Sequence, residues 1–207
     1  IDEAPNWSER AQMPTRRAGL ALATAGRGIY AIGGVSPEGV SAAVEVYLAD
    51  EDRWERGANK PTPTAYVGAG VIDGKIYVPG GCIEDGAATT TVEVYDPAAD
   101  QWTEAAPLPT PLCAYALAVH EGEIYLFGGT DGETVLATTF SYDPEQDRWE
   151  EQTAMTAPRT VAAAATLGDR IYVVGGYRQG RELPTCAAYD PTSDQWTPCA
   201  PMTVGRN

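Results

Sequence analysis

The stretch IYVVGG, from Ile171 to Gly176, joins a β-branched and aromatic run to two adjacent glycines. Such a run is typical of a β-strand. Paired glycines cost backbone entropy and add no side-chain packing, so a strand that ends in two of them indicates a requirement on the backbone. Glycine meets that requirement where φ is positive or where a neighbouring segment approaches closely.

The same pattern, isoleucine and tyrosine followed two residues later by Gly-Gly, recurs every 47 or 48 residues. Tryptophan keeps this period, and a tyrosine precedes each of the last four tryptophans by seven residues. The markers are the glycine pairs that begin at Gly33, Gly80, Gly128 and Gly175, the tryptophans Trp7, Trp54, Trp102, Trp149 and Trp196, and the tyrosines Tyr47, Tyr95, Tyr142 and Tyr189. Three markers with one period predict a chain built of structural repeats.

Each repeat has the same internal order. An Ala/Val/Gly-rich run such as 65–72 is followed by a short turn and by the Ile-Tyr run that ends in Gly-Gly. A variable loop then leads to a run that ends in tyrosine, such as 91–97, and a turn leads to the tryptophan. Four short strands per repeat, with turn residues between them and no helical periodicity, predict an all-β fold.

These features resemble the kelch-repeat family, and the resemblance covers essentially the whole chain. It implies a β-propeller with four-stranded antiparallel blades around a central channel. We expect four blades at about 14–59, 62–106, 110–153 and 157–200. Residues 1–13 are expected to form an extra N-terminal outer strand that belongs to a preceding blade, because Trp7 and Arg17 repeat the spacing of Trp196 and Arg206.

The number of blades leaves two arrangements open. Kelch propellers of this repeat length usually close with six or seven blades, so we expect an arc cut from a longer repeat array. A closed four-bladed ring is the alternative. The open ends of an arc would expose sheet faces and allow self-association.

The resemblance also implies where a ligand would bind. In the kelch family, ligands usually dock on the face formed by the loops after Gly-Gly and by the segments that join one blade to the next. The loops differ in charge and length, unlike the strands, as expected of binding loops on a rigid scaffold. The candidate binding residues are Arg16, Arg17, Tyr66 and Arg159 between blades, and Glu84, Asp85, Asp131, Tyr177, Arg178 and Arg181 in the loops.

Composition and motifs narrow the classes of function. A net charge of −15 disfavours nucleic acid as a partner, and no apolar run is long enough to span a membrane. The single histidine, His120, is expected in an exposed turn on the face opposite the loops, and no Walker or nucleophile-elbow motif occurs. We therefore expect a non-enzymatic scaffold for a protein or peptide partner, without cofactor or metal. The alternative is a carbohydrate-binding or sugar-isomerising kelch protein, similar to the bacterial sialic acid epimerase group.

The four cysteines do not form CxxC pairs, so a zinc site has no support. If Tyr189 pairs with Trp196 across the last hairpin, the same register places Cys186 opposite Cys199. Cross-strand neighbours have Cβ atoms about 4.5–5.5 Å apart, which would allow a disulfide. Cys82 and Cys113 fall in loop positions of adjacent blades and could also approach one another.

Overall fold

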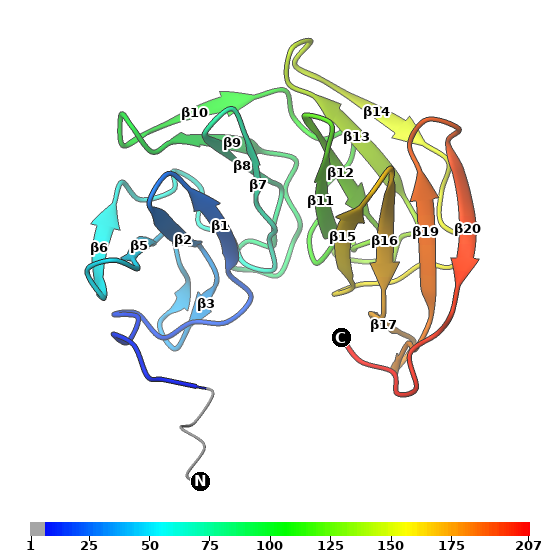
Figure 1. Ribbon diagram of the computed structural model, residues 1–207, viewed down its shortest axis with the longest axis horizontal. Coiled ribbons are helices and arrows are strands. Elements are labelled where there is room, and N and C mark those ends of the chain that lie inside the picture. Colours follow the sequence, from blue (N-terminus) through cyan, green and yellow to red (C-terminus); the bar gives the residue numbers. More distant parts are fainter. Residues whose placement is uncertain (1–6) are drawn as a thin grey trace, which may run out of the picture.

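A computed structural model describes residues 7–207, which form four antiparallel four-stranded sheets and contain no helix (Figure 1). We number these sheets as blades 1 to 4. Blade 1 contains β1 (Ala21–Ala25), β2 (Gly28–Ile32), β5 (Val44–Leu48) and β6 (Arg53–Gly57). Blade 2 contains β7 (Gly70–Ile72), β8 (Lys75–Pro79), β9 (Val92–Asp96) and β10 (Gln101–Ala105).

Blades 3 and 4 repeat this plan. Blade 3 contains β11 (Ala116–His120), β12 (Glu123–Phe127), β13 (Thr139–Asp143) and β14 (Arg148–Gln152), and blade 4 contains β15 (Ala163–Leu167), β16 (Arg170–Val174), β19 (Cys186–Asp190) and β20 (Gln195–Cys199). In blades 1 and 4 the loop after Gly-Gly forms a small hairpin, β3 (Val35–Ser36) with β4 (Gly39–Val40) and β17 (Tyr177–Arg178) with β18 (Arg181–Glu182). The all-β propeller architecture expected from the repeats is therefore confirmed.

The tyrosine and tryptophan of each repeat face one another across the outer hairpin of their blade. In blade 2, Tyr95 pairs with Trp102, and their ring centroids lie 5.0 Å apart. The other three blades keep the same register, with centroid distances of 4.9 to 5.2 Å. In blade 4 this register places Cys186 opposite Cys199, as expected, and the two form a disulfide.

A repeated polar clamp fastens each blade to the segment that leaves the blade before it. In blade 2, the hydroxyl of Tyr95 donates to Asp100 Oδ1 at 2.5 Å, and the same oxygen accepts the N–H of Ala58 at 2.6 Å. Trp102 Nε1 donates to the carbonyl of Ala58 at 2.9 Å. Equivalent bonds hold Ala11, Ala106 and Thr153 against blades 1, 3 and 4. The aromatic markers of the repeat thus hold neighbouring blades together through hydrogen bonds as well as packing.

The clamp carboxylates predict a dependence of stability on pH. Hydrogen bonds from the backbone of Ala106 and from the hydroxyl of Tyr142 lower the pKa of Asp147 from its ordinary value of 3.8. A carboxyl whose pKa is lowered by folding stabilises the fold fully above the unfolded-state pKa, and this contribution is lost as pH falls through the folded-state pKa. The free energy of unfolding should therefore decrease as pH falls below 3.8, and Asp147→Asn should weaken that decrease.

Urea denaturation of the wild type and of Asp147→Asn, from about pH 5 down to about pH 2, measures the two slopes. The amide of asparagine keeps an oxygen for the N–H of Ala106 and for the hydroxyl of Tyr142, so the variant isolates the charge. Equal slopes in the two proteins would contradict this role of Asp147.

The N-terminal segment corrects one expectation. Residues 7–13 form no strand, and Trp7 is 90% exposed. A fourth strand needs the third strand of its own blade as a partner, and no described strand lies beside residues 7–13. The expected register is nevertheless kept, because Ala11 accepts the indole N–H of Trp54 as Ala58 accepts that of Trp102. The rest of the expected strand, residues 1–6, lies outside the described residues.

The blades follow one another in an arc (Figure 1). Three clusters of buried side chains fill the spaces between them. The two end faces of the arc are uncovered in the part of the chain that the structure describes. Ile29 of blade 1 is 37% exposed, whereas its counterparts Ile76, Ile124 and Ile171 are fully buried. At the other end, Leu167 is 73% exposed. The described chain is thus an open arc rather than a closed four-bladed ring, and self-association through its end faces stays a prediction.

Candidate functional site

The two sets of segments expected to bind a ligand lie side by side in all four blades. Backbone N–H groups and carbonyls pair in both directions, at 2.8 to 3.0 Å, between an inter-blade residue and the residue directly after Gly-Gly. The pairs are Ala18 with Val35, Ala65 with Cys82, Cys113 with Thr130, and Thr160 with Tyr177. We call this surface the rim; it consists of residues 16–19, 63–66, 111–114 and 158–161 with the loops 35–41, 82–88, 130–135 and 177–183.

A chain of backbone hydrogen bonds runs along the rim from blade to blade. The N–H of Tyr66 donates to the carbonyl of Gly19 at 2.6 Å, that of Ala114 to Tyr66 at 2.8 Å, and that of Val161 to Ala114 at 2.7 Å. All four residues have positive φ, between 47° and 61°. This conformation is unfavourable for a β-branched residue such as Val161, and strain of this kind is characteristic of functional sites. Tyr66 is the one large side chain of the four, and it is 48% exposed.

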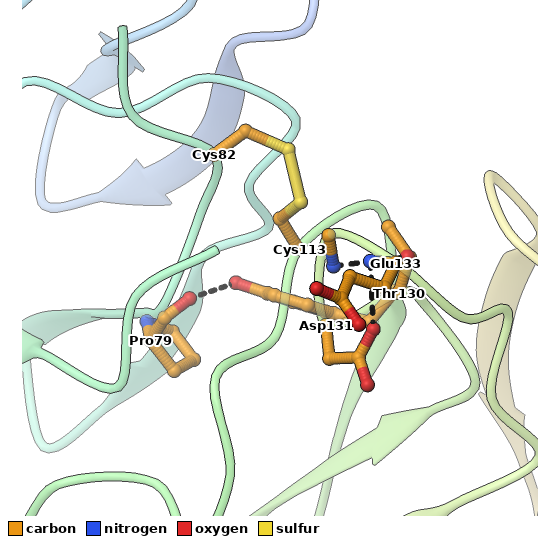
Figure 2. The surroundings of a disulfide bond; sticks show 8 residues. Pro79, Cys82, Cys113, Thr130, Asp131 and Glu133 are labelled. Carbon is orange, nitrogen blue, oxygen red and sulfur yellow. Dashed lines mark hydrogen bonds between the residues drawn. A yellow bond between two sulfur atoms is a disulfide. The ribbon is translucent and has the colours of Figure 1, made fainter. Parts of the chain in front are cut away.

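A disulfide between Cys82 and Cys113 joins the loop of blade 2 to the segment that enters blade 3 (Figure 2). Their Cα atoms lie 5.3 Å apart. The backbone of Cys113 also pairs with Thr130 in the loop of blade 3. The middle of the rim is therefore held by a covalent bond and by the backbone pairs on either side of it.

Removing this disulfide in the double variant Cys82→Ser/Cys113→Ser should lower the free energy of unfolding by about 2 kcal/mol. The bond closes a loop with a sequence separation of 31, and closing a loop restricts the unfolded chain more when the loop is longer. The matched control is Cys186→Ser/Cys199→Ser, whose separation is 13 and whose strands are already paired within one blade. Urea denaturation measures both losses, and a larger loss for the control pair would contradict the prediction.

Several candidate binding residues lie at the rim with exposed side chains. Arg16, Tyr66, Asp85, Tyr177 and Arg181 are exposed, and Arg178 is half-buried. The hairpin of β17 and β18 carries three of them, with Tyr177 opposite Glu182 and Arg178 opposite Arg181.

Two acidic candidates act largely within the rim itself. Glu84 Oε2 accepts the N–H of Val40 at 2.8 Å and so ties the loop of blade 2 to the hairpin of blade 1. Asp131 Oδ1 accepts the N–H groups of Thr134 at 2.7 Å and Glu133 at 2.9 Å (Figure 2). These backbone hydrogen bonds lower the pKa of Asp131, so its carboxylate stabilises a local turn. Both carboxylates therefore stabilise the conformation of the loops.

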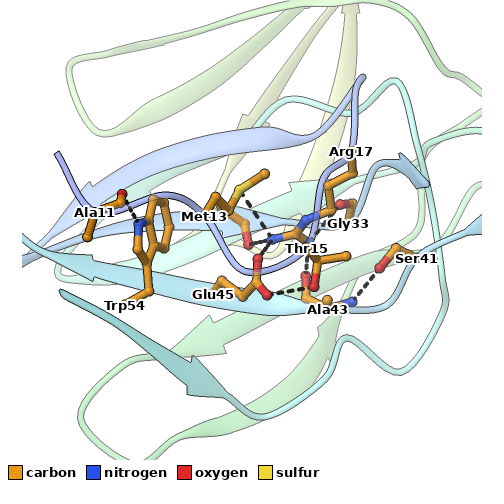
Figure 3. A network of polar contacts seen from close by, with 10 residues as sticks. Ala11, Met13, Thr15, Arg17, Gly33, Ser41, Ala43, Glu45 and Trp54 are labelled. Atoms are coloured by element: carbon orange, nitrogen blue, oxygen red, sulfur yellow. Dashed lines mark hydrogen bonds and ion pairs between the residues drawn. The ribbon is translucent and has the colours of Figure 1, made fainter. Parts of the chain in front are cut away.

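The structure corrects the expected place of two arginines. The side chain of Arg17 is fully buried in blade 1, where Nη2 binds Glu45 Oε2 at 2.8 Å and Nη1 donates to the carbonyls of Gly33 and Ala43 (Figure 3). Arg159 is 3% exposed and Nη1 donates to the carbonyl of Gly175 at 3.0 Å. Both guanidinium groups turn toward the glycine-ended strand of their own blade because its carbonyls need donors. Neither side chain belongs to the exposed surface of the rim.

The charged groups buried inside the blades were not predicted from the sequence. Glu45 and Glu93 stand two residues before the repeated tyrosine and are almost fully buried. Glu45 pairs with Arg17, and Glu93 pairs with Lys60. These ion pairs could have been found by aligning the repeats with one another. In both repeats that have an acidic residue two residues before the tyrosine, a basic residue stands six or ten residues after the preceding tryptophan.

His120 also differs from expectation. It ends β11 and is buried, with its ring centroid 6.4 Å from that of Tyr125. It lies at the turn end of its blade, away from the rim, as expected. Within residues 7–207 no group of three or more His, Cys, Asp or Glu side chains is placed to hold a metal ion, and no helix is long and apolar enough to cross a membrane.

The family model of the Kelch motif matches the chain four times, at residues 16–61, 63–109, 111–156 and 158–203. The chain belongs to the kelch-repeat family. Among curated kelch proteins, Kelch repeat and BTB domain-containing protein 12 from Homo sapiens is 34% identical, with 36% of this chain and 14% of that protein covered. Kelch-like protein 41b from Danio rerio is also 34% identical, with 41% of this chain and 14% of that protein covered.

A solved structure titled "Structure of YjhT" superposes on this kelch chain with a TM-score of 0.79. The superposition covers 95% of this chain and 69% of that chain, at 19% sequence identity. At that identity the likeness establishes the propeller fold. The two curated relatives are much longer proteins, of which the chain spans 14%.

Proposed function

We propose that this kelch-repeat chain is a non-enzymatic scaffold that binds a protein or peptide partner at the rim. The supporting observation is the backbone pairing at every blade, which fixes eight segments on one face. The side chains on that fixed backbone differ from blade to blade, unlike those of the strands. A rigid scaffold that presents variable loops is the usual arrangement of a binding surface.

Tyr66 and the hairpin of β17 and β18 are proposed as the main contacts. Tyr66 projects from a strained position of the rim, and Tyr177, Arg178 and Arg181 lie on one short hairpin. Tyrosine and arginine are enriched at protein interfaces, where they contribute large contact areas and several hydrogen-bond donors.

The sugar alternative receives less support from the positive-φ positions of the rim. Gly19, Tyr66, Ala114 and Val161 occupy the same position in successive repeats, and only Tyr66 carries a polar side chain. Isomerisation of a sugar requires acid and base groups that converge on the substrate. The residues at this position favour contact with a partner over proton transfer.

Selection of binding peptides from a random displayed library on the purified chain tests the proposal. Affinity for the selected peptides should fall by about tenfold or more in Tyr66→Gly and in Arg178→Ala/Arg181→Ala. Glycine stands at the position of Tyr66 in blade 1, as Gly19, so that variant keeps the local backbone. Asp169→Ala, in the exposed turn between β15 and β16, is the matched control and should bind as the wild type does.

Two results would overturn the proposal. One is a set of selected peptides whose affinity is unchanged in both rim variants. The other is catalysis, measured by NMR as faster interconversion of N-acetylneuraminate anomers in the presence of the protein.

A further inference from the structure

Each blade has one equivalent buried location. In blades 1 and 2 it holds a pair of opposite charges, and in blade 3 it holds only apolar side chains. At this location the segment after the tryptophan packs against the third strand of the next blade. In blade 1, the guanidinium of Arg17 meets the carboxylate of Glu45, which also accepts the hydroxyl of Thr15 (Figure 3). In blade 2, Lys60 meets Glu93.

Blade 3 fills the same location with apolar side chains. Leu108 and Leu112 take the places of the basic residues, Phe140 takes the place of the carboxylate, and all three are buried. Blades 1 to 3 thus follow the rule that a buried charge needs a partner of opposite charge, and that a pair can be replaced by apolar groups of similar volume.

Blade 4 departs from this rule. Arg159 keeps the arginine of blade 1, but Ala187 stands where blade 1 has Glu45, and Ala157 stands where blade 1 has Thr15. No carboxylate of residues 7–207 forms an ion pair with Arg159. The hydrogen bond to Gly175 is the only one that the side chain of Arg159 makes within the described chain. Its Nε is buried without a partner, as is that of Arg17.

The electrostatics of the two arginines differ accordingly. Burial lowers the pKa of both guanidinium groups. For Arg17 the neighbouring carboxylate of Glu45 opposes that effect, whereas no carboxylate opposes it for Arg159. Arg159 therefore carries a desolvated positive charge that is met by the carbonyl of Gly175 but by no carboxylate of the described residues.

A pocket of about 250 Å³ lies beside Arg159 and is lined by Ala187, the residue that stands where blade 1 has Glu45. Its walls combine apolar groups with hydroxyls at the exposed side, and Arg159 lies among them. They are formed by Thr156, Ala157, Arg159, Thr185, Cys186, Ala187, Trp196, Thr197 and Pro198. A water molecule takes about 30 Å³ in the liquid, so the pocket has room for a small organic molecule.

We propose that this pocket binds a small aliphatic carboxylate, of the size of propionate, whose carboxylate takes the place on Arg159 that Glu45 holds on Arg17. This site lies inside blade 4, apart from the exposed side chains of the rim, and it does not depend on the proposed function. Guanidinium and carboxylate match in planar geometry and charge, and their hydrogen bonds strengthen away from water. The apolar walls of Ala187, Trp196 and Pro198 suit a short alkyl chain.

The charge of the protein argues for a monoanion. The pocket contributes one positive charge, and the chain as a whole has a net charge of −15, which repels polyanions such as phosphate esters. A single carboxylate neutralises Arg159 without leaving excess negative charge in the pocket.

The test is a titration of the ¹⁵N-labelled protein with sodium propionate, followed at the indole N–H of Trp196, which Trp196→Phe identifies. A saturable shift of this resonance is expected. Propionamide, which has the same shape and no charge, should bind at least about tenfold more weakly, and sodium chloride at equal ionic strength should produce no saturable shift. Equal effects of propionate and propionamide would overturn the proposal.

Two matched variants keep the test independent of folding defects. Ala187→Glu places the side chain of blade 1 in the pocket, so it should abolish the propionate shift and raise the melting temperature. Ala187→Gln fills the same volume without charge, so it should abolish the shift with a smaller change in melting temperature. Propionate binding that persists in Ala187→Glu, or a melting temperature no higher in Ala187→Glu than in Ala187→Gln, would overturn the proposal.

A second ligand distinguishes a free carboxylic acid from the acidic side chain of a peptide. N-acetylglutamate amide presents the same propionate group as the side chain of a blocked amino acid. Binding of both compounds at Trp196 would indicate that acidic side chains of a peptide also enter the pocket. Binding of propionate alone would restrict the site to free acids, and binding of neither would overturn the proposal.

Discussion

Replacing Glu93 with phenylalanine is expected to lower the free energy of unfolding by about 3–5 kcal/mol. The ammonium group of Lys60 is fully buried, where it pairs with Glu93 and donates to the carbonyl of Thr62 at 3.0 Å. Burial already lowers the pKa of Lys60, and the carboxylate of Glu93 opposes that effect. Without Glu93 the ammonium would lie in the interior without a counter-charge, which costs more than an equivalent loss at the surface.

Blade 3 provides the control for this variant. The double variant Lys60→Leu/Glu93→Phe copies Leu108 and Phe140, which fill the same location without charges. It should recover most of the loss and remain about 1–2 kcal/mol below the wild type, because the N–H of Thr62 also loses its acceptor Glu93. Urea denaturation of both variants measures the coupling between the two positions. A double variant as unstable as Glu93→Phe would show that the ion pair is required in its own right.

The repeated parts of the fold could be predicted because each was seen four times. The Tyr–Trp register, the glycine-ended second strand and the turn positions recur at one period, so a local ambiguity in one repeat is resolved by the others. The same register predicts that Cys186 lies opposite Cys199, as it does in the structure. The extra outer strand is not formed at residues 7–13, because the spacing of Trp7 and Arg17 repeats that of an outer strand but a strand also needs a neighbour.

The positions of the charged side chains could not be predicted in the same way. Arg17 and Arg159 were expected at a binding surface because the kelch resemblance implies ligand contacts between blades, and arginine is usually exposed. Their burial depends on carbonyls of Gly33 and Gly175, which become available only once the blade has folded. Positions that depart from the repeat, such as Ala187 in place of glutamate, indicate properties of this chain that the family pattern does not predict.

The variant Gly128→Ala should lower the free energy of unfolding by about 2–4 kcal/mol. Gly128 has φ of 63°, and a Cβ at this residue would overlap the carbonyl oxygen of Arg159. That carbonyl cannot move away freely, because the N–H of Gly129 binds it at 2.8 Å. Alanine would therefore add backbone strain and break the hydrogen bond that fastens blade 3 to the segment entering blade 4.

Gly122→Ala separates the two causes. Gly122 has φ of 82°, but a Cβ there meets no atom within 4 Å, so its replacement tests the strain of positive φ alone. Its expected cost is about 1 kcal/mol. If the two variants lose equal stability in urea denaturation, close approach between blades does not explain the glycine pairs, and positive φ alone would account for them. A larger loss for Gly128→Ala means that the first glycine of each pair is required because the next blade begins against it.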